Sequence, residues 1–330
     1  MKNFIDTSAN AAFNKLKRLE KSAYSWLFSL FRIIILLSVG FIIIYPLFYM
    51  IVVSLQSKYA FLNSTRVWIP TDFAIVKNYK VALDCLEYAT SVLSTLKNEI
   101  VAAIIQVATC AVAAYGFARF DFRGKRIMTA ILFMTILVPD MVLLIPKTVN
   151  FSQLDFLGVL GLLNKLTGLD LRPNVLNSTG PFWLPALFGV GLRSGILIYI
   201  YIQFFRGLPR ELEEAAWVDG AGPIRTFLSI AIPSSGVVIL TVTVFSLIWH
   251  WNDVLLSSMY LTKEYPLSIM LQNIDTALSQ KYHVAVSAQH PDAMAYLMSS
   301  CLLYIAPMLI FYMIVQRWFI ESIDRVGITG

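Results

Sequence analysis

Residues 33–53 read IIILLSVGFIIIYPLFYMIVV, and none of these side chains is charged. A helix needs about 20 consecutive apolar residues to cross the hydrocarbon core of a bilayer, and this stretch reaches that length. It is too long for the apolar core of a signal peptide and lacks a small-residue cleavage site, so we expect it to remain in the mature chain. The stretch predicts an integral membrane protein.

Similar segments recur along the whole chain. Of its 330 residues, 58% are hydrophobic and 14% are charged, whereas about a quarter of the residues in a soluble domain are charged. A soluble chain this apolar could not cover its own surface, so lipid must replace water around much of it. Further spans are expected at 100–118, 127–146, 185–205, within 226–252 after Pro233, and at 293–316. These long continuous runs predict an all-α integral membrane fold with six transmembrane helices and exclude a β-barrel.

The positions of lysine and arginine predict the orientation of the chain. They concentrate before the first span, after the second, after the fourth and after the sixth, and these four segments alternate with less basic ones at 54–99, 147–184 and 253–292. Basic residues are enriched on the cytoplasmic side of a membrane, so both termini are expected there. The topology accounts for the net charge of +6, and we expect no binding of nucleic acid.

Three parts of the chain are expected. Residues 1–32 mix lysines with leucines and aromatic residues, which is typical of an amphipathic helix on the inner membrane surface. Residues 33–317 form the transmembrane domain, and residues 318–330 form a cytoplasmic tail.

The loop at 206–225 differs from an ordinary linker and reads RGLPRELEEAAWVDGAGPIR. Its proline suits the first turn of a helix, and the glutamates that follow complement the helix dipole. Leu212, Ala215 and Ala216 fall on one face of that helix, and an Asp-Gly pair ends it. A short helix with a small-residue face, held between two spans, fits a docking element for another protein. A capped surface helix that contacts nothing fits the local pattern equally well.

The spacing of this loop resembles the EAA motif of ABC-importer permeases, in which Glu-Ala-Ala is followed at fixed distances by Gly, Ile, Leu and Pro. The matching residues are Glu214, Ala215, Ala216, Gly220, Ile230, Ile232 and Pro233, with Ile232 in the place of leucine. Other stretches resemble the carbohydrate-uptake permeases, in particular the maltose-type second permease subunit. They lie at 78–79, 113–124, 138–139, 145–146, 251–253 and 316–320. The likeness covers roughly residues 30–330, and the ending at 327–330 departs from the usual one.

By this resemblance, the loop helix couples the chain to a cytoplasmic ATPase. The implied ATPase-coupling residues are Glu213, Glu214, Ala215, Ala216, Asp219 and Gly220. The chain has no phosphate-binding glycine-rich loop of its own, so ATP and magnesium are expected on the ATPase, and this chain is expected to be a non-catalytic pore subunit without a cofactor.

The resemblance also implies the partners and the solute. A second, paralogous permease subunit, two ATP-binding subunits and an extracytoplasmic sugar-binding protein are expected in a bacterial plasma membrane. The third outer loop, at about 254–290, would reach the binding protein, although a solvated connector also fits its sequence. The implied solute is a sugar, in particular a di- or oligosaccharide.

Four polar and aromatic residues gather at the outer end of the fifth span: Trp249, Trp251, Asn252 and Asp253. Aromatic rings stack on sugar faces, and amides and carboxylates bind hydroxyl groups, so these residues are candidates for the substrate pathway. Tryptophan is also the ordinary residue of a membrane interface, and the sequence leaves both interpretations open.

Asp140 and Arg193 are the charged residues closest to membrane depth. They fit either a proton relay or structural pairing and contact with the interface. Two isolated charges do not make the chain of ionisable groups that a secondary transporter needs, and such a transporter is the main alternative. The three histidines and three cysteines show no metal-binding spacing, so neither a metal site nor a membrane-embedded enzyme is expected. Among importers, an amino-acid or phosphate permease is the closest alternative.

Overall fold

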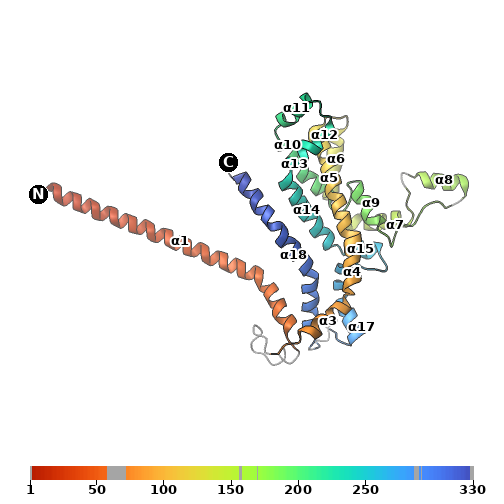
Figure 1. Cartoon of the computed structure of the whole chain (residues 1–330), viewed down its shortest axis with the longest axis horizontal. Coiled ribbons are helices and arrows are strands. Elements are labelled where there is room, and N and C mark those ends of the chain that lie inside the picture. Colours follow the sequence, from red (N-terminus) through yellow and green to blue (C-terminus); the bar gives the residue numbers. More distant parts are fainter. Residues whose placement is uncertain are drawn as a thin grey trace.

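The computed structural model describes residues 2–57, 72–155, 158–168, 170–285, 290 and 292–327, and it describes side chains only between 25 and 318. Within this part of the chain every regular element is a helix, apart from one isolated bridge between Gln56 and Phe73. Figure 1 shows α11 (Glu211–Val218) at one end of the bundle, and α3 (Ile75–Cys85) and α17 (Ile274–Tyr282) at the opposite end. This confirms the prediction of an all-helical membrane fold.

Within the described residues, three helices are long and apolar enough to cross a membrane. They occupy Ser25–Leu55, Tyr88–Arg119 and Ala293–Trp318 and correspond to the first, second and sixth predicted spans. The first belongs to α1 (Lys2–Leu55), which continues without a break through residue 32 and leans away from the bundle in Figure 1. The last belongs to α18 (Ala293–Gly327). Large apolar side chains are exposed on both helices, as expected of surfaces that face lipid.

The centre of the bundle is built from α5 (Val101–Arg119), α10 (Ser194–Gly207) and α14 (Gly236–Trp251). The buried face of α5 is rich in alanine, and small residues let membrane helices approach closely. Their shared core ends in aromatic residues near α11. Its buried members include Cys110, Ala114, Tyr115, Leu197, Tyr201, Phe205, Val238 and Val242.

The third predicted span, 127–146, is sharply bent. It is divided into α6 (Lys125–Leu137) and α7 (Asp140–Ser152), whose axes differ by 102°. Val138 and Pro139 between them are extended. Proline disfavours the helical conformation in the residue before it and cannot donate a backbone hydrogen bond, which explains the break.

The fourth predicted span begins later than expected. Residues 185–187 belong to a separate short helix, α9 (Gly180–Leu187), and α10 starts only at Ser194. Gly189 and Arg193 have positive φ angles of 69° and 53°, and these left-handed residues interrupt the chain. The 14 residues of α10 correspond to about 21 Å, less than the roughly 30 Å of a bilayer core. By length and composition the described chain therefore has three spans, or up to five when each bent pair counts as one.

The fifth span lies as predicted. A bent entry formed by α12 (Pro223–Thr226), η2 (Phe227–Ala231) and α13 (Ile232–Ser234) meets α14 at 82°.

Short helices fill the end of the bundle opposite α11. They are α4 (Tyr88–Thr95) with η1 (Leu96–Ile100), which lead into α5, and α15 (Leu255–Tyr260), α16 (Leu267–Gln272) and α17. The last three occupy the predicted third outer loop, of which 286–289 lie outside the described residues. Within the predicted second outer loop, α8 (Val159–Thr167) stands apart from the bundle in Figure 1.

Candidate functional site

The helix α11 is closed at its end by a turn that requires glycine. Gly220 has a φ of +82°, which side chains with a Cβ adopt only with strain. The amide of Ala221 donates to the carbonyl oxygen of Ala216 at 2.9 Å, and that of Gly220 donates to Trp217 at 3.0 Å. This pair of bonds is the Schellman motif. The Asp-Gly pair at 219–220 ends the helix as the sequence predicts.

Several apolar side chains of α11 are exposed. Leu212 is 46% exposed, Trp217 50% and Val218 88%, and Ala215 is also exposed. Glu214, Asp219 and Gly220 are exposed among them, whereas Ala216 is half-buried. A tryptophan and a valine exposed together on a short helix fit a surface that another protein covers.

Glu213 lies elsewhere than its neighbours. Its side chain is 4% exposed and accepts a hydrogen bond at 2.9 Å from Nε of Arg119, whose side chain is 5% exposed. Glu211 and Glu214 are exposed, whereas Glu213 is buried because α5 ends beside it and supplies its ionic partner.

A cavity of about 650 Å³ opens at the other end of α14. Its walls come from the junction of α6 and α7, the start of α10, the end of α14 and the start of α15. The polar and aromatic residues among its lining are Thr135, Asp140, Arg193, Trp249, Asn252 and Asp253. The structure thus brings three of the four candidate pathway residues into one cavity wall.

Trp251 is the exception among the four candidates. It is 4% exposed, its ring packs 5.8 Å from that of Tyr304, and it belongs to a second buried cluster with α3, α16, α17 and α18. Successive positions on a helix are about 100° apart, so Trp249 and Trp251 point in different directions. Trp251 is a core residue in this structure.

The two charges near membrane depth both reach the cavity, but each has its own partner. Arg193 lies over the ring of Trp249 at 5.1 Å, and Asp140 pairs with Lys147 at 4.0 Å. Trp249 also stacks on Phe245 at 5.5 Å between ring centroids. These contacts agree with structural pairing rather than with a relay between Asp140 and Arg193.

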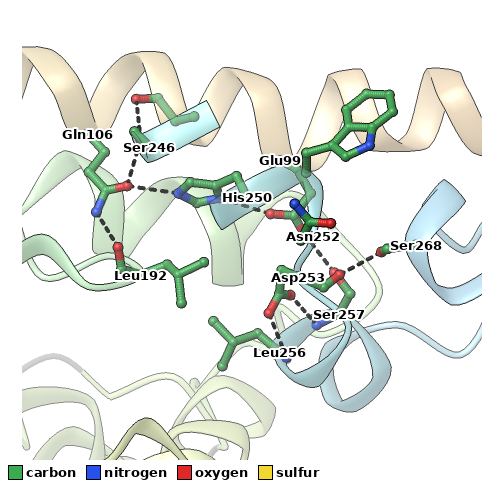
Figure 2. Close-up of polar contacts among 12 residues, drawn as sticks. Glu99, Gln106, Leu192, Ser246, His250, Asn252, Asp253, Leu256, Ser257 and Ser268 are labelled. Carbon is green, nitrogen blue, oxygen red and sulfur yellow. Dashed lines mark hydrogen bonds and ion pairs between the residues drawn. The ribbon is translucent and has the colours of Figure 1, made fainter. Parts of the chain in front are cut away.

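A buried polar network lies behind the cavity, and Figure 2 shows Glu99, Gln106 and His250 at its centre. Nδ1 of His250 lies 2.9 Å from Glu99 Oε2, and Nε2 lies 2.8 Å from Gln106 Oε1. Ser257 donates to Glu99 Oε1 at 2.6 Å. Gln106 Nε2 donates to the carbonyl oxygen of Leu192 at 2.6 Å and to Ser194 at 2.7 Å.

This network holds the residues on both sides of Arg193, since Gln106 binds the carbonyl oxygen of Leu192 and the hydroxyl group of Ser194. Asp253 extends the same polar region, because its carboxylate accepts from the amides of Leu256 at 3.3 Å and Ser257 at 2.9 Å and so begins α15. Breaking the network would therefore be expected to disturb the cavity wall.

This network was not predicted from the sequence. The spacing of the three histidines suggested no site, yet the structure places His250 between Glu99 and Gln106. The available signal was Glu99 and Gln106, two polar residues seven positions apart and hence on one face of an apolar helix. Their partner, His250, lies on another helix, and no spacing along the chain reveals that contact. Among the described residues, no group of three or more His, Cys, Asp or Glu side chains is placed to hold a metal ion.

Known proteins resemble this chain over the stretch that contains both candidate sites. A family model described as "Binding-protein-dependent transport system inner membrane component" matches residues 106–325, which include α11 and the end of α14. The osmoprotective compounds uptake permease protein GgtD of Synechocystis sp. is 26% identical over 298 residues, covering 88% of this chain and 89% of that protein. The probable starch degradation products transport system permease protein AmyC of Thermoanaerobacterium thermosulfurigenes is 23% identical over 280 residues, covering 84% and 89%.

One solved structure shares the fold. A bacterial ABC transporter involved in the import of the acidic polysaccharide alginate matches with a TM-score of 0.64 and 20% identity, over 89% of this chain and 96% of that chain.

Proposed function

The chain belongs to the family of binding-protein-dependent transport system inner membrane components, and from this premise we propose that it forms half of the pore of an ATP-driven sugar importer. The family is one of non-catalytic, multi-pass inner membrane permeases of ABC importers. The number of crossings, the coupling residues, the particular partners and the solute are the parts of the account that we propose.

The proposed chain crosses the membrane six times, through α1, α4 with α5, the bent pair α6 and α7, α10 with the segment from residue 185 that leads into it, α14 with its bent entry, and α18. The end that carries α11 faces the cytoplasm, because basic residues surround it and such residues are enriched on that side. They are Arg119, Arg123, Lys125, Arg126, Arg206, Arg210 and Arg225. Both termini then lie in the cytoplasm, because α1 continues unbroken from residue 2 into the first span and α18 continues beyond the last span to residue 327. Side chains of 1–24 and 319–330 lie outside the described residues.

The observation that carries the function is the exposure of apolar side chains on α11, a short helix held between two membrane segments. We assign Leu212, Ala215, Trp217 and Val218 to the contact with an ATP-binding subunit, with Glu214 and Asp219 at its polar edge. ATP and magnesium bind to that subunit in this proposal. Two such subunits, a second paralogous permease and an extracytoplasmic binding protein complete the importer, in the plasma membrane of a bacterium.

The sugar assignment rests on the cavity and on the relatives. Trp249, Asn252 and both signs of charge line one space of about 650 Å³, and such groups suit a ligand with hydroxyl groups and apolar ring faces. One relative is named for uptake of osmoprotective compounds and another for transport of starch degradation products. Both names are compatible with a small polyhydroxylated solute, in particular a di- or oligosaccharide.

Uptake by inside-out vesicles is not informative for an importer, so the test uses whole cells that carry the chain with its neighbouring genes. We expect uptake of radiolabelled maltose, maltotriose or trehalose, which stops when cellular ATP is depleted. Glutamine and inorganic phosphate serve as the competing solutes. If the cells took up glutamine or phosphate and none of the sugars, the sugar assignment would be wrong and the importer assignment would stand.

A further inference from the structure

Arg119 joins three helices at the α11 end of the bundle. It is the last residue of α5, and its Nε donates to Glu213 of α11 at 2.9 Å. Its Nη2 donates at 2.8 Å to the carbonyl oxygen of Leu208, the residue that follows α10. One guanidinium group therefore binds both α11 and the segment that leads into it from α10.

This ion pair is buried, unlike the other acidic groups of the same helix. Glu211 and Glu214 are exposed, whereas the side chains of Arg119 and Glu213 are only 5% and 4% exposed. Removing two charges from water is costly, and well-packed apolar residues often stabilise a fold as much as a buried pair. An arginine contributes a fixed geometry, because its rigid planar guanidinium group holds each acceptor at a set angle.

A layer of aromatic rings lies beneath the pair. The ring of Tyr115, one turn before Arg119 on α5, lies 5.5 Å from that of Phe205 on α10 and 4.9 Å from that of Phe227 in η2. Phe205 and Phe227 are themselves 6.4 Å apart. The segments before and after α11 are thus both packed against α5, and the ion pair fixes α11 itself.

We propose that Arg119 and Glu213 are positioning residues that make α11 and the adjoining ends of α5 and α10 move as one rigid body. When an ATPase displaces α11, the ends of α5 and α10 then move by the same amount. This inference rests on the proposed docking of an ATPase at α11, and it assigns to Glu213 an internal role in place of contact with that subunit.

The test measures one distance in two states of the assembled transporter. Spin labels are placed on cysteines at the exposed residues Arg210 and Asp121, in a chain whose Cys301 is replaced by serine because the other two cysteines are buried. The complex is purified with its co-encoded subunits. The distance between the two labels is measured by pulsed electron–electron double resonance, without nucleotide and after trapping with ATP and vanadate. We expect the parent distance to be the same in both states.

In the Glu213→Gln variant we expect the distance to match the parent without nucleotide and to shift by about 2 Å after trapping, which is the size of helix shifts in switching proteins. If the ion pair served stability alone, its loss would change the label distance by the same amount with and without nucleotide. Glu211→Gln is the matched control, since it removes the same charge from an exposed position of α11, and it should behave as the parent does.

An unchanged distance in Glu213→Gln in both states overturns the inference. If that variant does not assemble, the exchange variant Arg119→Glu with Glu213→Arg decides. Assembly with the parent's state-independent distance supports the inference, while failure to assemble or a state-dependent distance overturns it. If the parent chain itself binds no ATPase, the proposed function falls and this inference falls with it. If the ATPase binds and only the predicted shift is missing, only this inference falls.

Discussion

Gly220 is the residue on which the shape of α11 depends most. Its φ of +82° and the two closing hydrogen bonds end the helix directly after Val218. A residue with a Cβ in the left-handed region costs about 1–2 kcal/mol, and a β-branched one fits worst.

We expect Gly220→Val to reduce the amount of ATPase that co-purifies with the chain, while the amount of the chain in the membrane stays unchanged. Gly222→Ala is the control, because Gly222 has an ordinary φ of −75° and open space around its Cα. Equal ATPase recovery from both variants would contradict the assignment of α11 as the docking helix.

Trp249 and Trp251 are expected to respond differently to truncation. Trp249 lines the cavity beneath Arg193, so Trp249→Ala should raise the KM of uptake about tenfold, equivalent to about 1.4 kcal/mol of binding, at a normal level of protein. Trp251 is buried, so Trp251→Ala should destabilise the protein by about 3–5 kcal/mol and lower its yield. The measurements are uptake kinetics and the level of protein in membranes. If the two variants behave alike, the cavity assignment is not supported.

These two residues also show how far sequence reasoning reaches at this scale. The sequence indicated a cluster of four polar and aromatic residues, and three of them share a cavity wall. Helical periodicity could have separated Trp251 from the rest. No pattern along the chain could have joined Glu99 and His250, because two separate helices bring them together.

At the scale of the helices, α10 packs closely against α6 through one glycine. A Cβ added to Gly195 would lie 2.6 Å from Thr135 Oγ1 and 2.9 Å from Ile136 Cγ1, both shorter than ordinary contact. Gly207, on the same helix, has no atom within 4 Å of such a Cβ.

We therefore expect Gly195→Val to destabilise the protein by about 1–3 kcal/mol and to lower the melting temperature of the purified protein in detergent. Gly207→Ala should leave that temperature nearly unchanged. If both variants melted at the parent's temperature, the close approach of α6 and α10 would be refuted.

The long apolar helices were predictable because each is a continuous run with the length of a span. The bend between α6 and α7 was not predicted, because hydrophobic content does not show where a helix changes direction. Pro139 was the residue that indicated it. The late start of α10 depends on left-handed residues such as Arg193, and the sequence alone gives no sign that an arginine takes that conformation.

At the scale of the whole molecule, the same three helices connect the two candidate sites. The central helix α5 meets Glu213 at one end and, through Gln106, the polar network behind the cavity. The helix α10 begins beside Arg193 and ends at Gly207, directly before Leu208, and α14 ends at the cavity wall. A close-packed core of these helices suits a subunit that transmits movement between an ATPase and a solute site.

The mass of the complex that this chain forms decides whether it is an importer subunit. The chain is tagged, expressed with its genomic neighbours, extracted in mild detergent and weighed by native mass spectrometry. We expect one copy of this chain with one second permease and two ATP-binding subunits. A chain that purifies alone, or as a homodimer that transports without ATP, would contradict the importer assignment and favour a secondary transporter.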